Sequence, residues 1–233
     1  MRKTLKMAFV LYKTDGSPPA RAAMMVVDLL GLKVKTSEVF PPTGDHLKPE
    51  FVQKNPIHTI PFIEDGNFRL ADSHAIITYL MSKYGDDKKL EWYPNDLEVR
   101  ATVDQRMYMD ATIVFPKIRA MLATSLIDRK SVPTNEQLAE VKEVYGILEK
   151  YLEQTRFFAA DHLTLADISL VASVSTLDGV IPVNEFPKLS QWFETMQQYD
   201  WYQSANKPGL EKITKMFHKN NKLAITERKL QNN

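Results

Sequence analysis

The chain has 233 residues, of which 44% are hydrophobic and 25% are charged, so it is large enough to bury a substantial core. Its 30 basic and 29 acidic side chains give a formal net charge of +1, and we therefore expect no strong overall attraction to nucleic acid or to a membrane surface. The sequence contains no cysteine, which excludes disulfides, a cysteine nucleophile and cysteine-ligated metal sites, so any thiol chemistry must use the thiol of a substrate.

The first third of the chain alternates short strand and helix candidates. The apolar run Met7 to Leu11 is a candidate for a buried strand, and it is too short for a signal peptide or a membrane span, so we expect a cytoplasmic protein. A helix is predicted over Pro18 to Leu30, beginning at Ser17 and ending at Gly31. The β-branched segment Leu32 to Val39 predicts a second strand and completes a β-α-β unit.

A hairpin and a further helix follow. Ile60 to Ile63 and Asn67 to Leu70 are predicted strands that flank an acidic turn ending in Gly66. The segment Asp72 to Tyr84 is predicted to be a helix.

The polar segment after this helix is the predicted domain boundary, because it has a central proline and little periodicity. We expect one domain over residues 1–85, a linker over 86–95 and an all-helical domain over 96–233. Apolar residues at helical spacing predict a long, two-faced helix from Asp96 to Ser125 and another between Leu138 and Leu152.

The end of the chain, from Lys207, carries seven basic residues and only two acidic ones. Apolar periodicity is sparse beyond Phe217. This basic C-terminal tail is therefore expected to be a solvated extension that is peripheral to catalysis, with an electrostatic contact to a membrane or partner as the alternative.

The segment SPPAR, Ser17 to Arg21, places a hydroxyl at a helix N-cap with proline in the first helical position, where its missing N–H costs nothing. Plain caps of this kind are common. The functional interpretation is that the hydroxyl and the first amides of the helix converge on an anion.

The segment NPIHTIP, Asn55 to Pro61, ends where the hairpin begins. A proline that opens a strand leaves the preceding residue extended, so Ile60 would present free backbone groups. If the Ile60–Pro61 bond is cis, those groups face a peptide ligand rather than a neighbouring strand; an ordinary loop proline is the alternative.

Asp72 and Ser73 directly precede the apolar run of the next helix. Ser73 is a candidate cap whose amide and hydroxyl would bind a carboxylate, while Asp72 would pair with an ammonium group. A ligand with an α-amino acid terminus would satisfy both residues, and an unliganded cap is the alternative.

These three segments together resemble the glutathione-binding half of the cytosolic glutathione transferases, most closely those of the insect epsilon class. The sequences SPPARA, NPIHTIPFIEDG and ADSHAIITYL occur in the order and at the spacing of the family, and the resemblance covers about residues 7–205. It implies a thioredoxin-like α/β N-terminal domain followed by an all-α domain. It also implies a homodimeric enzyme that joins the thiolate of glutathione to small hydrophobic electrophiles.

By that resemblance, Ser17 is the catalytic serine, whose hydroxyl stabilises the glutathione thiolate. The implied glutathione-binding residues are His46, His58, Ile60, Pro61, Asp72 and Ser73. The backbone of Ile60 would pair with the cysteinyl unit, and Asp72 and Ser73 would hold the γ-glutamyl end. Asp72 stands where related classes often have the longer glutamate.

The hydrophobic substrate is expected on the long helix of the second domain. The predicted residues are Met109, Ile113, Phe115, Ile118, Arg119 and Leu122. Helix-packing core is the alternative for the apolar ones. Arg119, set among apolar neighbours, is expected either to meet a carboxylate or a ligand or to reach solvent.

The segment LTLADIS contains Thr164 and Asp167 three apart before an apolar run, which is a capping box with aspartate in the carboxylate role. The resemblance places it at the start of a buried helix and gives it a structural role. None of the five histidines forms an i, i+4 pair, and we expect no metal.

Three alternatives stay open. Tyr12, at the end of the first strand, is a rival for the activating hydroxyl. The chain could instead be a non-catalytic protein that binds glutathione or hydrophobic ligands, or a structural transferase-like module of a larger assembly.

Overall fold

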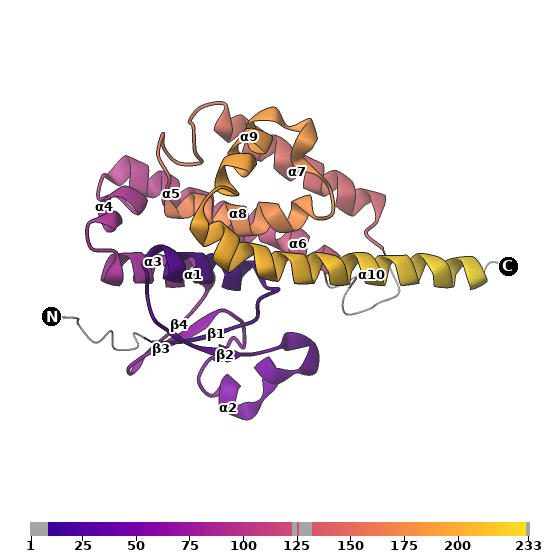
Figure 1. The fold of residues 1–233 in the computed structure, drawn as a ribbon, viewed down its shortest axis with the longest axis horizontal. Coiled ribbons are helices and arrows are strands. Elements are labelled where there is room, and N and C mark those ends of the chain that lie inside the picture. The colour runs from indigo at the N-terminus through magenta and orange to yellow at the C-terminus, as the bar shows by residue number, and fades with distance from the viewer. Residues whose placement is uncertain (1–8, 123–124, 126–131, 232–233) are drawn as a thin grey trace.

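The computed structural model of the protein describes residues 9–122, 125 and 132–231, and it divides this part of the chain into a small sheet domain and a larger helical domain (Figure 1). The sheet domain contains β1 (Val10–Lys13), α1 (Pro18–Leu29), β2 (Lys35–Glu38), α2 (Pro49–Val52), β3 (Phe62–Asp65), β4 (Phe68–Ala71) and α3 (Ser73–Tyr84). The helical domain contains α5 (Leu97–Met109), α6 (Phe115–Leu122), α7 (Asn135–Leu152), α8 (Leu165–Asp178), α9 (Pro187–Met196) and α10 (Lys207–Gln231). The predicted fold class, an α/β domain followed by an all-α domain, is confirmed.

The four strands form one mixed sheet in the order β2-β1-β3-β4, with β1 parallel to β2 and the other pairs antiparallel. Side chains alternate between its two faces. Leu11 and Ile63 are fully buried in the core that α1 and α3 share with the helical domain. Tyr12 and Phe62 lie on the opposite face, where they pack against Phe51 of α2.

The hairpin differs from the sequence prediction in its turn. Glu64 and Asp65 were expected in the turn but form the end of β3, and Gly66 follows with φ of 62°. Both carboxylates are paired inside the sheet domain: Asp65 Oδ2 accepts hydrogen bonds from the hydroxyls of Tyr79 and Tyr84 at 2.8 and 2.7 Å. These long-range partners let acidic residues occupy the strand.

The predicted linker contains a short helix, α4 (Lys88–Trp92). Its apolar anchor is Trp92, which is buried and meets Trp201 edge to face with ring centroids 6.2 Å apart. One anchoring side chain produces no periodicity, so the sequence pattern did not indicate this helix. The exact domain boundary stays a prediction.

The predicted long helix is interrupted by a π turn at Asp110–Val114, which separates α5 from α6. Pro116 has no N–H to donate to the carbonyl of residue 112 and its ring would crowd that carbonyl, so a regular α-helix cannot continue through it. The turn instead closes with the N–H of Phe115 bonded to the carbonyl of Asp110. Residues 123 and 124, in the last turn of the predicted helix, lie outside the described residues.

The capping box predicted at Thr164 and Asp167 is present at the start of α8. Asp167 is fully buried, and its carboxylate accepts hydrogen bonds from the backbone N–H of Thr164 and Phe158 and from Trp192 Nε1. Burial raises the pKa of Asp167, and these donors offset part of that effect.

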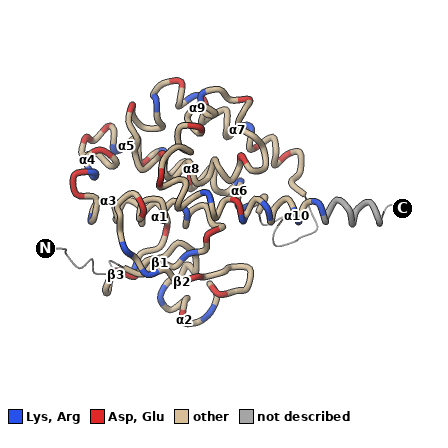
Figure 2. The backbone as a smooth tube through the Cα atoms, viewed as in Figure 1, with Lys and Arg blue, Asp and Glu red and all other residues tan. Residues whose placement is uncertain are grey.

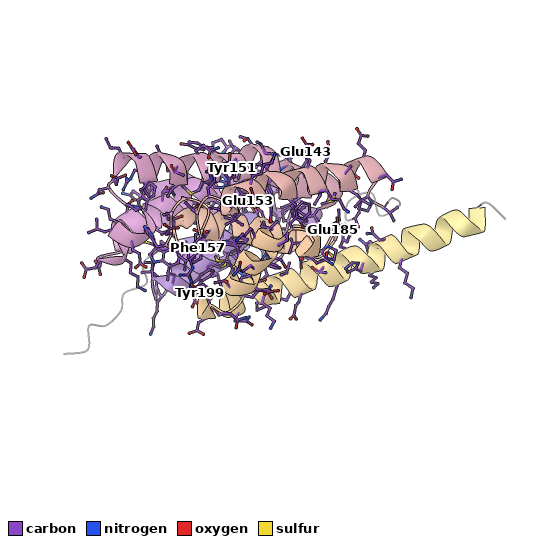
Figure 3. All side chains as sticks on the ribbon, turned by 90° about the horizontal axis from the view of Figure 1, so that it is seen from above. Glu143, Tyr151, Glu153, Phe157, Glu185 and Tyr199 are labelled. Carbon is purple, nitrogen blue, oxygen red and sulfur yellow. The ribbon has the colours of Figure 1, made fainter. Side chains whose placement is uncertain are left out.

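The basic tail forms α10, a helix that extends beyond the rest of the helical domain (Figure 3). Acidic and basic residues are interspersed over both domains (Figure 2). No helix within the described residues is long and apolar enough to cross a membrane.

Candidate active site

The register of the sheet brings the three predicted ligand-binding segments to one end of it. Phe62 at the start of β3 is paired with Tyr12 near the end of β1 and with Ala71 at the end of β4. Ile60 lies two residues before Phe62, and Asp72 directly follows Ala71. The loop that leaves β1 leads to Ser17. One end of the sheet therefore carries all three segments.

Ser17 is the N-cap of α1, as predicted. Its Oγ accepts a long hydrogen bond of 3.4 Å from the N–H of Ala20, and its own proton has no acceptor among the described residues. Pro18 and Pro19 have no N–H, and the N–H of Arg21 is bonded to the carbonyl of Ser17 at 2.9 Å. The start of this helix thus offers a hydroxyl donor rather than the set of free amides that was expected.

The loop before β3 leaves the backbone groups of Ile60 without hydrogen bonds in the described part of the chain. The Ile60–Pro61 bond is cis, as predicted, and the backbone N–H and C=O of Ile60 make no hydrogen bond within the described part of the chain. Asn55 is buried and donates from Nδ2 to the carbonyl of Thr59 at 2.8 Å, which holds the loop in shape. Sequence analysis did not single out this role of Asn55.

Asp72, rather than Ser73, caps α3, which corrects the prediction. Asp72 Oδ1 accepts from the N–H groups of His74 and Ala75 at 2.9 and 3.1 Å. The His74 ring, whose Nδ1 lies 3.5 Å from Asp72 Oδ1, and the backbone donors hold the pKa of Asp72 below its ordinary value, so the carboxylate is charged at neutral pH. Its side chain is 57% exposed, which leaves it accessible to a cation.

Ser73 is the first residue of α3 and is buried. Its hydroxyl makes no hydrogen bond with any residue that the structure describes. An unpaired, nearly buried hydroxyl beside an exposed carboxylate suits a ligand that carries a carboxylate and an ammonium on the same carbon.

The two histidines predicted near the peptide backbone of the ligand lie together. The rings of His46, in the short 3₁₀ helix Asp45–Leu47, and His58 have centroids 6.0 Å apart. His46 Nδ1 is buried and has no hydrogen-bond partner in the part of the chain that the structure describes. His58 has a positive φ of 43° and its N–H bonds the carbonyl of Asn55 at 2.8 Å.

A buried polar network that sequence analysis missed connects this site to the helical domain. His74 Nε2 lies 3.3 Å from Asp110 Oδ2 in the π turn, and the hydroxyl of Ser169 in α8 donates to the same oxygen. The other ring nitrogen of His74, Nδ1, lies 3.5 Å from Asp72 Oδ1. Burial alone would lower the pKa of His74, but the two carboxylates outweigh it and raise this pKa to about 9.

Tyr12 is occupied by a second cluster, on the face of the sheet that packs against α2. Its hydroxyl donates to Glu64 Oε2 at 2.5 Å, and Lys54 Nζ donates to the same hydroxyl at 2.9 Å. Burial alone would raise the pKa of Glu64, but the hydrogen bonds from Tyr12 and Lys54 hold it below its ordinary value.

The six residues predicted for the hydrophobic substrate do not share one surface. Met109 and Ile118 are buried in the core, whereas Ile113 and Arg119 are exposed and Phe115 and Leu122 are half-buried. Arg119 has no ion-pair partner among the described residues, so it reaches solvent, the alternative kept in the prediction.

Leu122 is the one of these six for which the structure shows a connection to the loop before Ser17. It lines a small pocket together with Ile213 and Phe217 of α10. Ile213 in turn packs against Gly16, since a Cβ placed on that glycine would meet Ile213 Cδ1 at 3.5 Å. The start of α10 was expected to be peripheral, but its packing against this loop places it beside the candidate active site.

No group of three or more His, Asp or Glu side chains that could hold a metal ion occurs among the described residues. The site therefore consists of a hydroxyl, an unpaired backbone segment, a carboxylate and a second hydroxyl. Such a set can bind a short peptide through its backbone and its amino-acid terminus and can donate a hydrogen bond to a negatively charged atom.

Comparison with protein families gives two matches that together span most of the chain. Residues 11–88 match the glutathione S-transferase N-terminal domain, and residues 104–200 match the glutathione S-transferase C-terminal domain. A curated relative, glutathione S-transferase 1 of Manduca sexta, is 44% identical over 207 residues, which cover 87% of this chain and 94% of that protein.

Solved structures agree with this result. An epsilon-class glutathione S-transferase from the housefly Musca domestica is 38% identical and superposes with a TM-score of 0.87, covering 91% of this chain and 98% of that one. A glutathione transferase homologue from Drosophila mojavensis with bound glutathione is 34% identical, with a TM-score of 0.87 over 92% of this chain and 98% of that one.

Proposed function

The chain belongs to the glutathione S-transferase family, whose enzymes join the thiol of glutathione to small hydrophobic electrophiles, and we propose that Ser17 supplies the hydroxyl that stabilises the glutathione thiolate. The observation that carries this proposal is the contrast between two hydroxyls. The Ser17 proton has no acceptor among the described residues, whereas Tyr12 donates to Glu64.

The catalytic task is to ionise a weak acid. A thiol with a pKa near 8.5 is only about 3% ionised at pH 7, and the thiolate is the attacking species. One hydrogen bond to an anion contributes about 1.5–3 kcal/mol, which lowers the pKa of the bound thiol by roughly one to two units. A single well-placed hydroxyl is thus sufficient, and no general base is required.

Glutathione is proposed to bind along the end of the sheet. Its cysteinyl unit pairs with the free backbone of Ile60, and its γ-glutamyl end meets Asp72 through the ammonium and Ser73 through the carboxylate. His46 and His58 lie near the glycyl end. The support is the unpaired backbone of Ile60, the exposed carboxylate of Asp72 and the unsatisfied Nδ1 of His46.

The electrophile is proposed to bind between the loop before Ser17, the end of α6 and the start of α10, with Leu122 as the member of the predicted set that is connected to this loop through Ile213. Ile213 and Phe217 are added to that set because they line the same pocket. The physiological electrophile is set by the shape of this region. Its class is tested by measuring conjugation rates over a panel of aryl halides, unsaturated aldehydes and peroxides.

The enzyme is proposed to act as a cytoplasmic homodimer. The support for a dimer is an exposed apolar stripe on α5, where Leu97 and Tyr108 are 81% and 66% exposed and Ala101 lies between them. A second copy of the chain would cover this stripe.

The serine assignment is tested by ultraviolet titration of bound glutathione in Ser17→Ala and Tyr12→Phe. A raised thiol pKa in the first variant alone supports Ser17. The same change in the second variant alone would transfer the role to Tyr12.

A further inference from the structure

The side chain of Arg21 crosses from α1 into the helical domain and is fully buried there. Its guanidinium donates to the carbonyl of Ala172 at 3.3 Å, to the hydroxyl of Ser175 at 3.4 Å and to the side chains of Thr176 and Asn206. All four partners are neutral. A buried cation with only neutral partners is costly, so it contributes little to stability relative to an apolar side chain of its size.

The partners of Arg21 come from two elements that also support α10. Ala172, Ser175 and Thr176 belong to α8, and Asn206 ends the π turn Tyr202–Asn206 that leads into α10. Asn206 Nδ2 also donates to Ser175 Oγ at 3.1 Å, which connects the two elements. One side chain from the first turns of α1 therefore fixes that helix to the part of the domain from which α10 begins.

Gly209, in the first turn of α10, lies directly against the Ser17 loop, which we define as Thr14–Ser17. A Cβ at Gly209 would stand 2.0 Å from the carbonyl oxygen of Asp15 and 3.0 Å from Arg21 Cδ. Only glycine allows α10 to approach the loop this closely. The backbone of Asp15 and the side chain of Arg21 thus share one neighbour.

The next turn of α10 adds two contacts to the same loop. Ile213 packs against Gly16, and Lys212 Nζ lies 2.9 Å from Asp15 Oδ2. Within the loop, the N–H of Ser17 bonds the carbonyl of Thr14 at 3.2 Å. The residues that lead into Ser17 are therefore held from the helical domain as well as by the sheet.

We propose that Arg21 and Gly209 are positioning residues, which fix the Ser17 loop and the start of α1 against the helical domain and so hold the Ser17 hydroxyl where it donates to the thiolate. This inference rests on the proposed role of Ser17. A hydrogen bond loses much of its strength when its donor moves by a few tenths of an ångström or turns away from its acceptor. A displacement of the Ser17 loop by that amount therefore reduces the stabilisation of the thiolate.

The test compares two glycine-to-alanine variants by ultraviolet titration of bound glutathione. Gly209→Ala pushes α10 away from the Asp15 carbonyl. Gly146→Ala in α7 is the matched control, because its Cβ would meet no atom closer than Phe186 Cε1 at 4.0 Å. We expect Gly209→Ala to raise the thiol pKa by about half a unit to one unit, a 3- to 10-fold loss of kcat/KM at neutral pH, and Gly146→Ala to leave both unchanged.

A double-mutant cycle shows whether Gly209 acts through Ser17. In a Ser17→Ala background the Gly209→Ala effect on the thiol pKa should vanish, because the hydroxyl that it displaces is gone. An effect of equal size in both backgrounds would overturn the proposal. So would a lower melting temperature of Gly209→Ala with an unmoved titration midpoint, since that result would make Gly209 a packing residue only.

The same cycle separates this inference from the serine assignment. If Ser17→Ala raises the thiol pKa and Gly209→Ala does not, only the positioning role is wrong. If Ser17→Ala leaves the titration midpoint of the thiol unmoved, the serine assignment itself is wrong. The positioning role of Arg21 and Gly209, which depends on Ser17, is then excluded as well.

Two milder variants apply if Gly209→Ala does not fold. Ile213→Val trims the side chain that touches Gly16, and Arg21→Lys keeps the charge but cannot reach all four acceptors. Either is expected to raise the thiol pKa in the same direction. Unchanged midpoints in both variants would overturn the proposal.

Discussion

The hydroxyl of Tyr12 and the carboxylate of Glu64 form a hydrogen bond of 2.5 Å, and Lys54 Nζ stands 2.9 Å from both oxygens. The ring of Tyr12 also packs against Phe51 and Phe62 beneath the sheet. This tyrosine therefore has a structural role of its own in the sheet domain.

Ser17→Ala removes the hydroxyl donor and leaves only the N–H of Ala20, which loses its Ser17 Oγ acceptor, as a free amide in the first turn of α1. We expect the thiol of bound glutathione to titrate about one to two units higher, which costs roughly 10- to 100-fold in turnover at neutral pH. Thiolate absorbance against pH measures the shift directly. In parallel, Tyr12→Phe should lower the melting temperature, because it breaks the cluster with Glu64 and Lys54, and leave the thiol midpoint in place.

Asp72→Asn tests the proposed contact with the glutathione ammonium without removing the helix cap. Asparagine caps helices as well as aspartate and tolerates the positive φ of 73° at this position. We expect the KM for glutathione to rise roughly tenfold with little change in melting temperature. Asp96→Asn, at the equivalent cap of α5, is the control, and an equal rise in KM there would contradict a specific contact.

His74→Gln tests the buried pair with Asp110. The pKa of His74 is raised to about 9 in the folded chain from 6.5, so its stabilising charge is fully present below pH 6.5 and is lost as the pH rises through 9. Glutamine keeps a donor but carries no charge. We expect it to cost on the order of 2–4 kcal/mol in free energy of unfolding at pH 6, and less as the pH approaches 9.

Denaturant titrations of both proteins across this pH range measure the difference. His162→Gln is the control, because His162 is exposed and its ring nitrogen Nδ1 lies 3.1 Å from a neutral group, the carbonyl of Leu163. A penalty for His74→Gln that is the same at pH 6 and pH 9 would show that the charge of His74 does not matter.

Tyr108→Lys tests the proposed dimer surface on α5. A charge within a covered apolar stripe should weaken self-association by at least tenfold, because it loses its hydration when the surface is covered. Sedimentation or size-exclusion chromatography over a range of concentrations follows the dissociation. Leu90→Lys on α4, also at an exposed apolar residue, should leave association unchanged.

Local signals in the sequence predicted those parts of the fold and of the candidate site that depend on residues close together in the chain. The cap at Ser17, the exposed backbone before Pro61 and the capping box at Thr164 all follow from residues within four positions of one another. The pairing of Asp110 with His74 and Ser169 could not be predicted, since it joins residues 36 and 59 positions apart.

Gly209 shows the same limit more sharply. In the sequence it is a glycine near the start of a basic helix, with no signal of its own. Position 209 requires a glycine because the carbonyl of Asp15, far away in the chain, lies where a Cβ atom would be. Close backbone approach between distant segments leaves no periodic pattern, so sequence analysis treated the start of this helix as part of a peripheral tail.

The π turn at Asp110–Val114 makes the helix around it sensitive to length. A π turn holds one residue more than an α-helical turn, and each residue of an α-helix advances by about 100°. The downstream half is thus in a different rotational phase from the upstream half. The wide turn absorbs its extra residue and so keeps Ile118 and Met121 buried. A residue inserted or deleted elsewhere in α5 or α6 would have no such turn to absorb it and would rotate these side chains by about that angle, so grafts of this helix between relatives must preserve its length.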